Sequence, residues 1–277
     1  MTITGDYLMA AVFTLIGGFV FFLGFYKWRK YRIIRDTPTS KIRSMAMGVV
    51  EIHGSVEADQ LIKTPFSKTE CVYYKWEIKE YRRSSSSSGK SSSNKWVGVG
   101  SGEQSVPFFA RDETGRALVE PDKAEFIVAY KKVFYQKGKG LIGSIKVLSK
   151  LVKALKNLDP NDPTSLNIDG DDLVPMESGG SVRTVRVGDR KYYEYFIEPD
   201  DNLFVLGTAA NDSSVPDNVV IKRGKNEKTF IISDKSERGV LKNLKKLMMV
   251  CFIGGGIFVA AGIVMLLQML NIIPGVD

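Results

Sequence analysis

Two long apolar runs, one near each end of the chain, constrain its fold more than any other feature. The first extends from Tyr7 to Tyr26 and contains twenty residues without a charge. At a rise of about 1.5 Å per residue, a helix of this length spans about 30 Å, the thickness of the hydrocarbon core of a bilayer. The second extends from Leu247 to Leu270, with Gln268 as its only strongly polar side chain. The sequence therefore predicts transmembrane helices at residues 7–26 and 247–270.

Basic residues flank the two runs on their inner sides only. Residues 1–6 and 271–277, on the outer sides, contain no Lys or Arg. The inner flanks carry five basic residues each: Lys27, Arg29, Lys30, Arg32 and Arg35 after the first run, and Lys235, Arg238, Lys242, Lys245 and Lys246 before the second. By the positive-inside rule, both termini lie outside and the middle of the chain faces the cytoplasm. We expect an integral membrane protein, in the plasma membrane if the source is prokaryotic, and no cleaved signal peptide, because no basic residue precedes the first run.

The stretch between the runs has the pattern of a β-rich soluble domain, which we expect at residues 44–233. In the run from Val50 to Val56, apolar side chains alternate with Glu51, His53 and Ser55, as in a half-buried strand. Further strands are predicted at residues 72–79, 96–99, 106–110, 117–119, 182–187, 192–197, 203–206, 219–221 and 229–232, the last two as a hairpin. The serine-rich residues 84–94 are expected to form a flexible loop.

One segment has the period of a helix instead. Leu141, Ile145, Leu148, Val152 and Leu155 step by four and three residues, and Lys146, Lys150 and Lys153 lie on the opposite side, with Lys156 nearer the border. These four lysines are the candidate site for an anionic lipid surface. The alternative is that the apolar side covers the sheet while the lysines are only solvated. The fold class predicted is α+β, a β-rich soluble domain with one amphipathic helix, flanked by two transmembrane helices.

The residues of metal and nucleophilic sites are scarce. The chain has one His and two Cys, which excludes a cysteine–histidine zinc module by count. We expect His53 to be solvated and Cys71 to be a plain buried thiol, and no phosphate-binding glycine loop is present. The sequence thus predicts no catalytic residue, no cofactor and no metal. Residues 131–156 form a basic segment that contains eight lysines and no acid. Nucleic-acid binding is not expected there, since its aromatic residues, Phe134 and Tyr135, are too few and too bunched to stack bases.

Small residues in the two runs indicate close helix packing. Gly17, Gly18 and the glycines at 254–256 allow helices to approach each other. They pack the two spans together or form a homo-oligomer; tolerance of glycine in lipid-facing helices is the other interpretation.

The order of several motifs resembles a known family. GVVEIHGSVEA at 48–58 precedes LIKTPFSKTECVYYKWEIKE at 61–80, SVPFFARDETGRALVEP at 105–121, DDNLFVLGTAA at 200–210 and VVIKRGKNEKTFIIS at 219–233. This order resembles the GIDE domain, also called BAM for beside-a-membrane, of the mitochondrial ubiquitin ligase family named MULAN. The resemblance implies two flanking spans and a RING after the second. The chain ends seven residues after Leu270, so we expect no RING in it, as in prokaryotic-type relatives of that family.

Three functions follow as hypotheses. The first is a membrane-anchored, non-catalytic module that contacts an unidentified protein partner or an anionic lipid surface. The second is an E3 ubiquitin ligase-like component that acts with a RING on another chain. The third is a membrane-bound enzyme with an unrecognised acidic or tyrosine-based site. The flanking charges place the domain in the cytoplasm, and this predicted location differs from that of the family, whose GIDE domain lies in the mitochondrial intermembrane space.

Overall fold

The chain divides into a helical unit and a β-rich unit. The computed structural model describes residues 3–85, 92–138, 173–176, 185–213, 215 and 218–270. The helical unit consists of Met1–Pro38 with Lys235–Asp277, and the β-rich unit is Thr39–Asp234. The amphipathic helix expected at residues 141–158 lies outside the described residues, so its packing stays a prediction.

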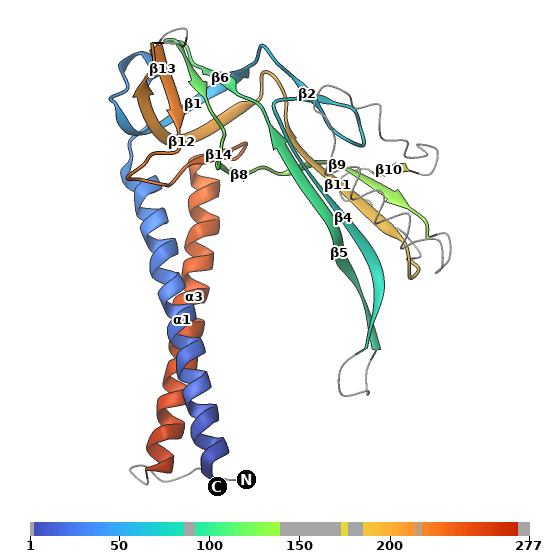
Figure 1. The fold of residues 1–277 in the computed structure, drawn as a ribbon, viewed down its shortest axis with the longest axis vertical. Helices are drawn as coiled ribbons and strands as arrows, with labels where there is room; N and C mark the ends of the chain where they lie inside the picture. The colour runs from blue at the N-terminus through green and yellow to red at the C-terminus, as the bar shows by residue number, and fades with distance from the viewer. Residues whose placement is uncertain are drawn as a thin grey trace. The chain divides into compact units, whose positions relative to one another are not determined.

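The helical unit is a pair of long helices, α1 (Ile3–Asp36) and α3 (Glu237–Met269) (Figure 1). Both are long and apolar enough to cross a membrane. Each helix extends past its apolar run into the basic flank, because nothing in the flanking residues breaks a helix. The helices are antiparallel: Gly24 lies against Phe252, Gly17 against Val259, and Thr14 against Gly262.

Glycines allow the two backbones to approach each other. A Cβ atom on Gly255 would lie 2.6 Å from the backbone nitrogen of Phe21, and one on Gly17 would lie 2.7 Å from the backbone nitrogen of Val259. Phe21 and Phe25 then pack their rings edge to face against Phe252, with both centroid distances at 5.2 Å. Gly17 and Gly255 therefore do pack the spans together, as one interpretation predicted, whereas an added Cβ atom on Gly18, Gly254 or Gly256 would meet nothing within 4 Å.

The β-rich unit contains a small closed sheet. Its ring consists of β1 (Gly48–Glu57), β6 (Phe108–Arg111), β7 (Arg116–Val119), β13 (Val219–Lys222) and β12 (Asn202–Asn211), and it closes because β12 also pairs with β1. β14 (Ile231–Ser233) pairs with β12, and β8 (Glu125–Ile127) pairs with β14. All pairings are antiparallel except β7–β13 and β8–β14. The 3-10 helix η1 (Ile42–Ser44) precedes β1, and its Ile42 donates to the carboxylate of Asp112 at 2.9 Å.

A second sheet of five antiparallel strands has the order β10-β9-β11-β4-β5. These strands are β10 (Val174–Met176), β9 (Tyr130–Gln136), β11 (Arg190–Ile197), β4 (Tyr73–Ser85) and β5 (Ser92–Ser105). The short hairpin β2 (Ile62–Lys63) and β3 (Glu70–Cys71) lies beside it in the fold. β4 and β5 are the longest strands and extend past the others as a two-stranded ribbon (Figure 1).

One hydrophobic core joins the two sheets. It includes Ile52 and Val205 from the closed sheet and Trp76, Tyr192 and Phe196 from the open one. The turn between β11 and β12 carries the chain from one sheet to the other, and Lys131 binds it through Glu198 at 2.9 Å and Asp201 at 2.5 Å. Burial alone would lower the pKa of Lys131, but the hydrogen bonds and charges of these two acids raise it above its ordinary value. A partly exposed ion-pair cluster thus links β9 to the corner between the sheets.

Several sequence predictions need correction. The hairpin predicted between residues 219–221 and 229–232 is wrong, because β13 and β14 each pair with a different half of β12 instead of with each other. Residues 185–187, predicted as strand, form the turn that leads into β11. The serine-rich loop is shorter than expected, since β4 continues to Ser85 and β5 begins at Ser92. Glu51, assigned to a polar face, is fully buried, because Thr39 donates to its carboxylate at 2.6 Å and Ser40 donates to its carbonyl oxygen at 2.8 Å.

Candidate functional site

The outer face of the five-stranded sheet carries a group of tyrosines and lysines that we call the tyrosine–lysine face. Its members are Tyr130 on β9, Lys191, Tyr193 and Tyr195 on β11, and Lys75, Glu77 and Lys79 on β4. Side chains alternate along a strand, so the members on β4 and β11 share this face while Trp76, Ile78, Tyr192 and Phe196 point into the core. Tyr130 is 42% exposed, and the other members are half-buried.

Each lysine of this face lies against an aromatic ring. The Lys79 ammonium is 4.8 Å from the centre of the Tyr193 ring, and the Lys75 ammonium is 5.4 Å from that of Tyr195. Tyr130 packs edge to face against both tyrosines, at 5.6 and 6.2 Å. Such contacts fix the rings in place before any partner arrives. A rigid group of tyrosines is the type of surface on which protein interfaces concentrate their binding energy.

Glu77 neutralises the centre of this face. Its carboxylate lies 2.9 Å from the Lys75 ammonium and 3.7 Å from that of Lys79, and the Tyr195 hydroxyl donates to it at 3.4 Å. Partial burial would raise the pKa of Glu77, but the two lysines and Tyr195 lower it below its usual range. The carboxylate therefore stays ionised and paired at neutral pH, which suits a structural role.

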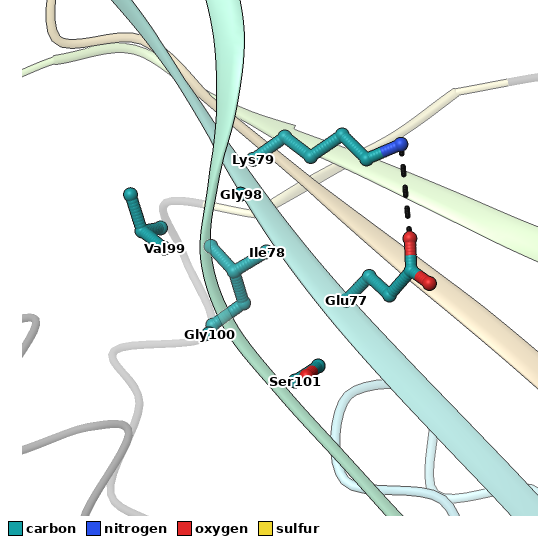
Figure 2. Close-up of a pocket in the computed structure, with 7 residues that line it drawn as sticks. All are labelled: Glu77, Ile78, Lys79, Gly98, Val99, Gly100 and Ser101. Carbon is teal, nitrogen blue, oxygen red and sulfur yellow. Dashed lines mark ion pairs between the residues drawn. The ribbon is translucent and has the colours of Figure 1, made fainter. Parts of the chain in front are cut away.

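A shallow cavity of about 420 Å³ lies next to this face at a β-bulge. Val99 is the extra residue of the bulge, because Ile78 pairs with Gly100 and Lys79 pairs with Gly98. Figure 2 shows the Glu77–Lys79 ion pair on one side of the strand and Ile78 and Val99 on the other. The lining residues are Glu77, Ile78, Lys79, Gly98, Val99, Gly100 and Ser101. Backbone and glycine form much of this lining, so the described residues offer no converging set of polar side chains for chemistry.

A buried carboxylate behind the sheet has a structural environment. Glu194 is fully buried and accepts hydrogen bonds from the backbone amides of Phe66 at 2.6 Å and Ser67 at 3.1 Å. Burial raises the pKa of Glu194, and the Ser67 side chain and these amides only partly oppose the shift. The Ser67 hydroxyl is also bonded to those of Thr64 and Thr69, both at 2.8 Å. Glu194 therefore anchors the turn between β2 and β3.

The sequence-predicted site residues have different outcomes. Lys146, Lys150, Lys153 and Lys156 lie outside the described residues, so they remain a prediction. His53 is on the surface, with 47% of its side chain exposed, as expected. Cys71 is a buried free thiol, and burial raises its pKa to about 12, which makes it a poor nucleophile. Within the part of the chain that the structure describes, no group of His, Cys, Asp or Glu is placed to hold a metal ion.

Sequence reasoning missed the tyrosine–lysine face. Residues 192–197 were recognised as a strand, but residues 130–136 were interpreted only as part of a basic segment and not as the strand β9. The signal was available in Lys191, Tyr193 and Tyr195, which alternate with buried residues. The sequence did not reveal which strands lie beside β11, because β9 and β4 are far from it in the sequence.

The chain was compared with known proteins and families. Neither the curated proteins nor the solved structures contain a significant match to it. The model of the GIDE family, described as E3 Ubiquitin ligase, matches residues 77–267. This match covers more than half of the 277 residues and includes most of β4, all of β5 to β14 and most of α3, whereas α1 and β1 to β3 lie before it. The chain therefore belongs to the GIDE family.

Proposed function

We propose that this protein is a membrane-anchored, non-catalytic interaction module whose β-rich unit lies on the cytoplasmic side. The observation that carries the proposal is the pair of apolar helices, α1 and α3, at the two ends of a GIDE-family β domain. Two spans hold such a domain at a bilayer permanently, without enclosing it. The basic residues on the inner flanks of both helices favour the cytoplasmic side.

The tyrosine–lysine face is the surface that we assign to a protein partner. Tyrosine combines a large contact area with few rotatable bonds, so little conformational entropy is lost when it is buried by a partner. Glu77, the acid within this face, is engaged in ion pairs with Lys75 and Lys79. This arrangement supports binding and offers no group poised for proton transfer.

Affinity purification of the full-length chain in mild detergent tests the proposal. The variant with Tyr130→Ala and Tyr193→Ala should retain a co-purifying partner at least about ten-fold less well, the effect of losing interface hot spots. A matched control replaces two exposed apolar residues elsewhere, Met47→Ala and Leu61→Ala, and should retain the partner. Equal retention by both variants would remove the tyrosine–lysine face from the proposal. A turnover of substrate by the purified chain would overturn the non-catalytic role.

A second candidate function is a ligase-like component, which the description of the family as E3 Ubiquitin ligase favours. In this version the chain supplies the membrane-bound platform and a RING on another chain supplies the transfer. A RING protein among the purified partners would support this function if the present chain accelerates the ubiquitin transfer that the RING protein promotes. No acceleration with that partner bound would exclude it.

A further inference from the structure

The outer edge of β5 has no strand paired to it among the described residues. β5 ends the order β10-β9-β11-β4-β5 and pairs with β4 alone among the described strands. Tyr81 of β4 exchanges backbone hydrogen bonds with Asp189 and Gly188, on the β11 side of the strand. Residues opposite each other in an antiparallel pair alternate between bonded and non-bonded, so Trp96, opposite Tyr81, directs its N–H and C=O to the open edge. Gly98, two residues further along β5, does the same.

The bulge at Val99 decides what kind of strand this edge can take. An open edge is a template for pairing with another chain, and a bulge interrupts its regular pattern. Before the bulge, residues 94–98 pair with β4 in an unbroken register. A second copy of β5 carries the same bulge and cannot pair along its whole length. The edge therefore suits a short extended segment of a partner protein.

An opening over Gly98 connects this edge to the tyrosine–lysine face. A Cβ atom on Gly98 would meet nothing within 4 Å. Gly98 lies opposite Lys79 in the register, and both line the cavity at the bulge (Figure 2). A residue of an added strand opposite Gly98 would lie about 10 Å from the backbone of Lys79, which is two strand spacings. A Glu and a Lys side chain together span this distance, because Gly98 leaves the space between them clear.

The lysines beside the opening favour an acidic partner. Lys191 lies directly opposite Lys79 across β11 and β4, a position in which like charges repel each other. Glu77 lies 3.7 Å from the Lys79 ammonium, but its nearer contact, at 2.9 Å, is with Lys75. Lys191 has no ion pair among the described residues, and its ammonium lies 4.9 Å from the Trp96 ring at the open edge. Acidic side chains on an added strand would complement these two charges.

We propose that β5 binds an extended acidic segment of a partner protein as an added antiparallel strand along residues 94–98. The backbone groups of Trp96 and Gly98 hold the segment. A Glu opposite Gly98 reaches Lys79, and a Glu opposite Trp96 reaches Lys191. In strand addition, main-chain bonds supply affinity and alternate side chains supply specificity. The inference rests on the proposed function, since it names the chemistry of the partner and adds the edge of β5 to the surface that takes it.

The synthetic peptide Val-Glu-Val-Glu-Val-Glu-Val tests this with the full-length chain in mild detergent. Anisotropy of a fluorescent label on the peptide should report binding. The bound peptide should slow hydrogen exchange at the amides of Trp96 and Gly98, which should exchange freely without it. An analogue that is N-methylated at every Glu keeps the charge but cannot donate to β5, so it should bind at least about ten-fold more weakly. The peptide with Lys in place of each Glu should not bind.

Two substitutions at one position test the same edge from the side of the chain. Gly98→Pro removes the outward N–H but keeps the bonds between β4 and β5, because proline is tolerated on an edge strand in this orientation. It should weaken binding about ten-fold, whereas the matched control Gly98→Ala keeps the N–H and should bind as the parent does. Thermal melting reports whether the proline variant folds. If it does not, the N-methylated peptide measures the same bonds.

A pair of double variants tests the charge. Lys79→Gln with Lys191→Gln should weaken binding roughly three- to ten-fold, and high salt should have a similar effect. Replacing two exposed lysines between β13 and β14, Lys225→Gln with Lys228→Gln, removes the same charge and should leave binding unchanged. The same loss in both double variants would show that only net charge attracts the peptide, and would overturn the proposal.

Three further results would overturn it. One is the absence of peptide binding, and another is equal binding of the N-methylated analogue. The third is slow exchange at Trp96 and Gly98 in the free chain, because the edge would then be covered already. Partner retention separates this inference from the proposed function. A folded Gly98→Pro variant that keeps a partner lost by the Tyr130→Ala and Tyr193→Ala variant removes the edge alone, whereas retention by both removes the tyrosine–lysine face as well.

Discussion

Glu194 is a buried acid with a structural role in the fold. Its carboxylate is shielded from water and held by the amides of Phe66 and Ser67. An isolated buried carboxylate would cost a great deal of free energy, and the two amides lower that cost without removing it. The remaining cost appears as a raised pKa, with burial as its cause. Glu194 therefore makes the stability of the domain depend on pH.

The sign of this dependence gives a prediction. The pKa of Glu194 is higher in the folded than in the unfolded state, so its contribution is fully present below about pH 4.5, the unfolded value, and is lost as pH rises through the folded pKa. Glu194→Gln keeps an oxygen for both amides but cannot ionise. The melting temperature of the parent chain in detergent should fall relative to that of the variant as pH rises from 4.5. Parallel melting curves at every pH would contradict this role.

Two glycines of β5, Gly102 and Gly98, allow a matched test of packing by single substitutions. A Cβ atom on Gly102 would lie 2.8 Å from the ring of Trp76, whereas one on Gly98 would meet nothing within 4 Å. Gly102→Ala should destabilise the domain by about 1–3 kcal/mol, because the core is already packed around Trp76. Gly98→Ala should be neutral or stabilising by about 0.4–1 kcal/mol, since it restricts the unfolded chain. Thermal melting of the two variants side by side measures the difference, and equal effects would contradict the packing argument.

At the scale of the elements, the close packing of α1 against α3 depends on glycines that lie on the facing sides of the two helices. Gly255 faces the backbone of Phe21, while its neighbour Gly254 faces open space. Gly255→Ala should therefore separate α1 from α3 and weaken their packing, whereas Gly254→Ala should not. Cross-linking by a short thiol-reactive reagent between cysteines placed at Phe13 and Phe258, whose rings stack at 5.7 Å, should slow in the first variant only. Equal cross-linking rates would show that close approach at Gly255 is not needed.

The sequence predicted those elements that have a strong local pattern. The alternation around Ile52, Trp76 and Tyr192 identified β1, β4 and β11, and the absence of charge identified the apolar parts of both helices. Short strands such as β8 and β10 were missed, because three residues carry too little period to recognise. The partners of a strand were also missed: β13 and β14 were paired with each other, although each pairs with a different half of β12. Pairing depends on contacts between distant parts of the chain, which a local pattern does not encode.

The candidate site was less predictable than the fold. The tyrosine–lysine face combines Tyr130, Lys75 and Tyr195 from three strands, so it exists only after the sheet has formed. Lys131 belongs to the basic segment of the sequence, yet its charge is paired with Glu198 and Asp201 of the same domain. Charge counted along a sequence does not distinguish a lysine that is paired inside the fold from one that meets a ligand.

At the scale of the whole molecule, the flanking charges give a prediction about orientation. The five basic residues between Lys27 and Arg35 and the five between Lys235 and Lys246 should hold both ends of the domain inside. A reporter fused at either terminus should read as external in the parent chain. Replacing the ten residues by Gln, with lysines added to residues 1–6 and 271–277, should invert both readings. An external reading for the domain of the parent chain would contradict the proposed localisation.

The closed sheet has a consequence for biosynthesis. Its ring is completed only when β12 meets β1, and β13 must also be in place beside β7. These strands lie at opposite ends of the domain sequence, so the ring cannot close until nearly the whole domain has left the ribosome. Nascent β1 and β7 therefore each keep one open hydrogen-bonding edge until β12 and β13 have been made. Unpaired strand edges favour aggregation, so this interval is when the domain is most exposed to it.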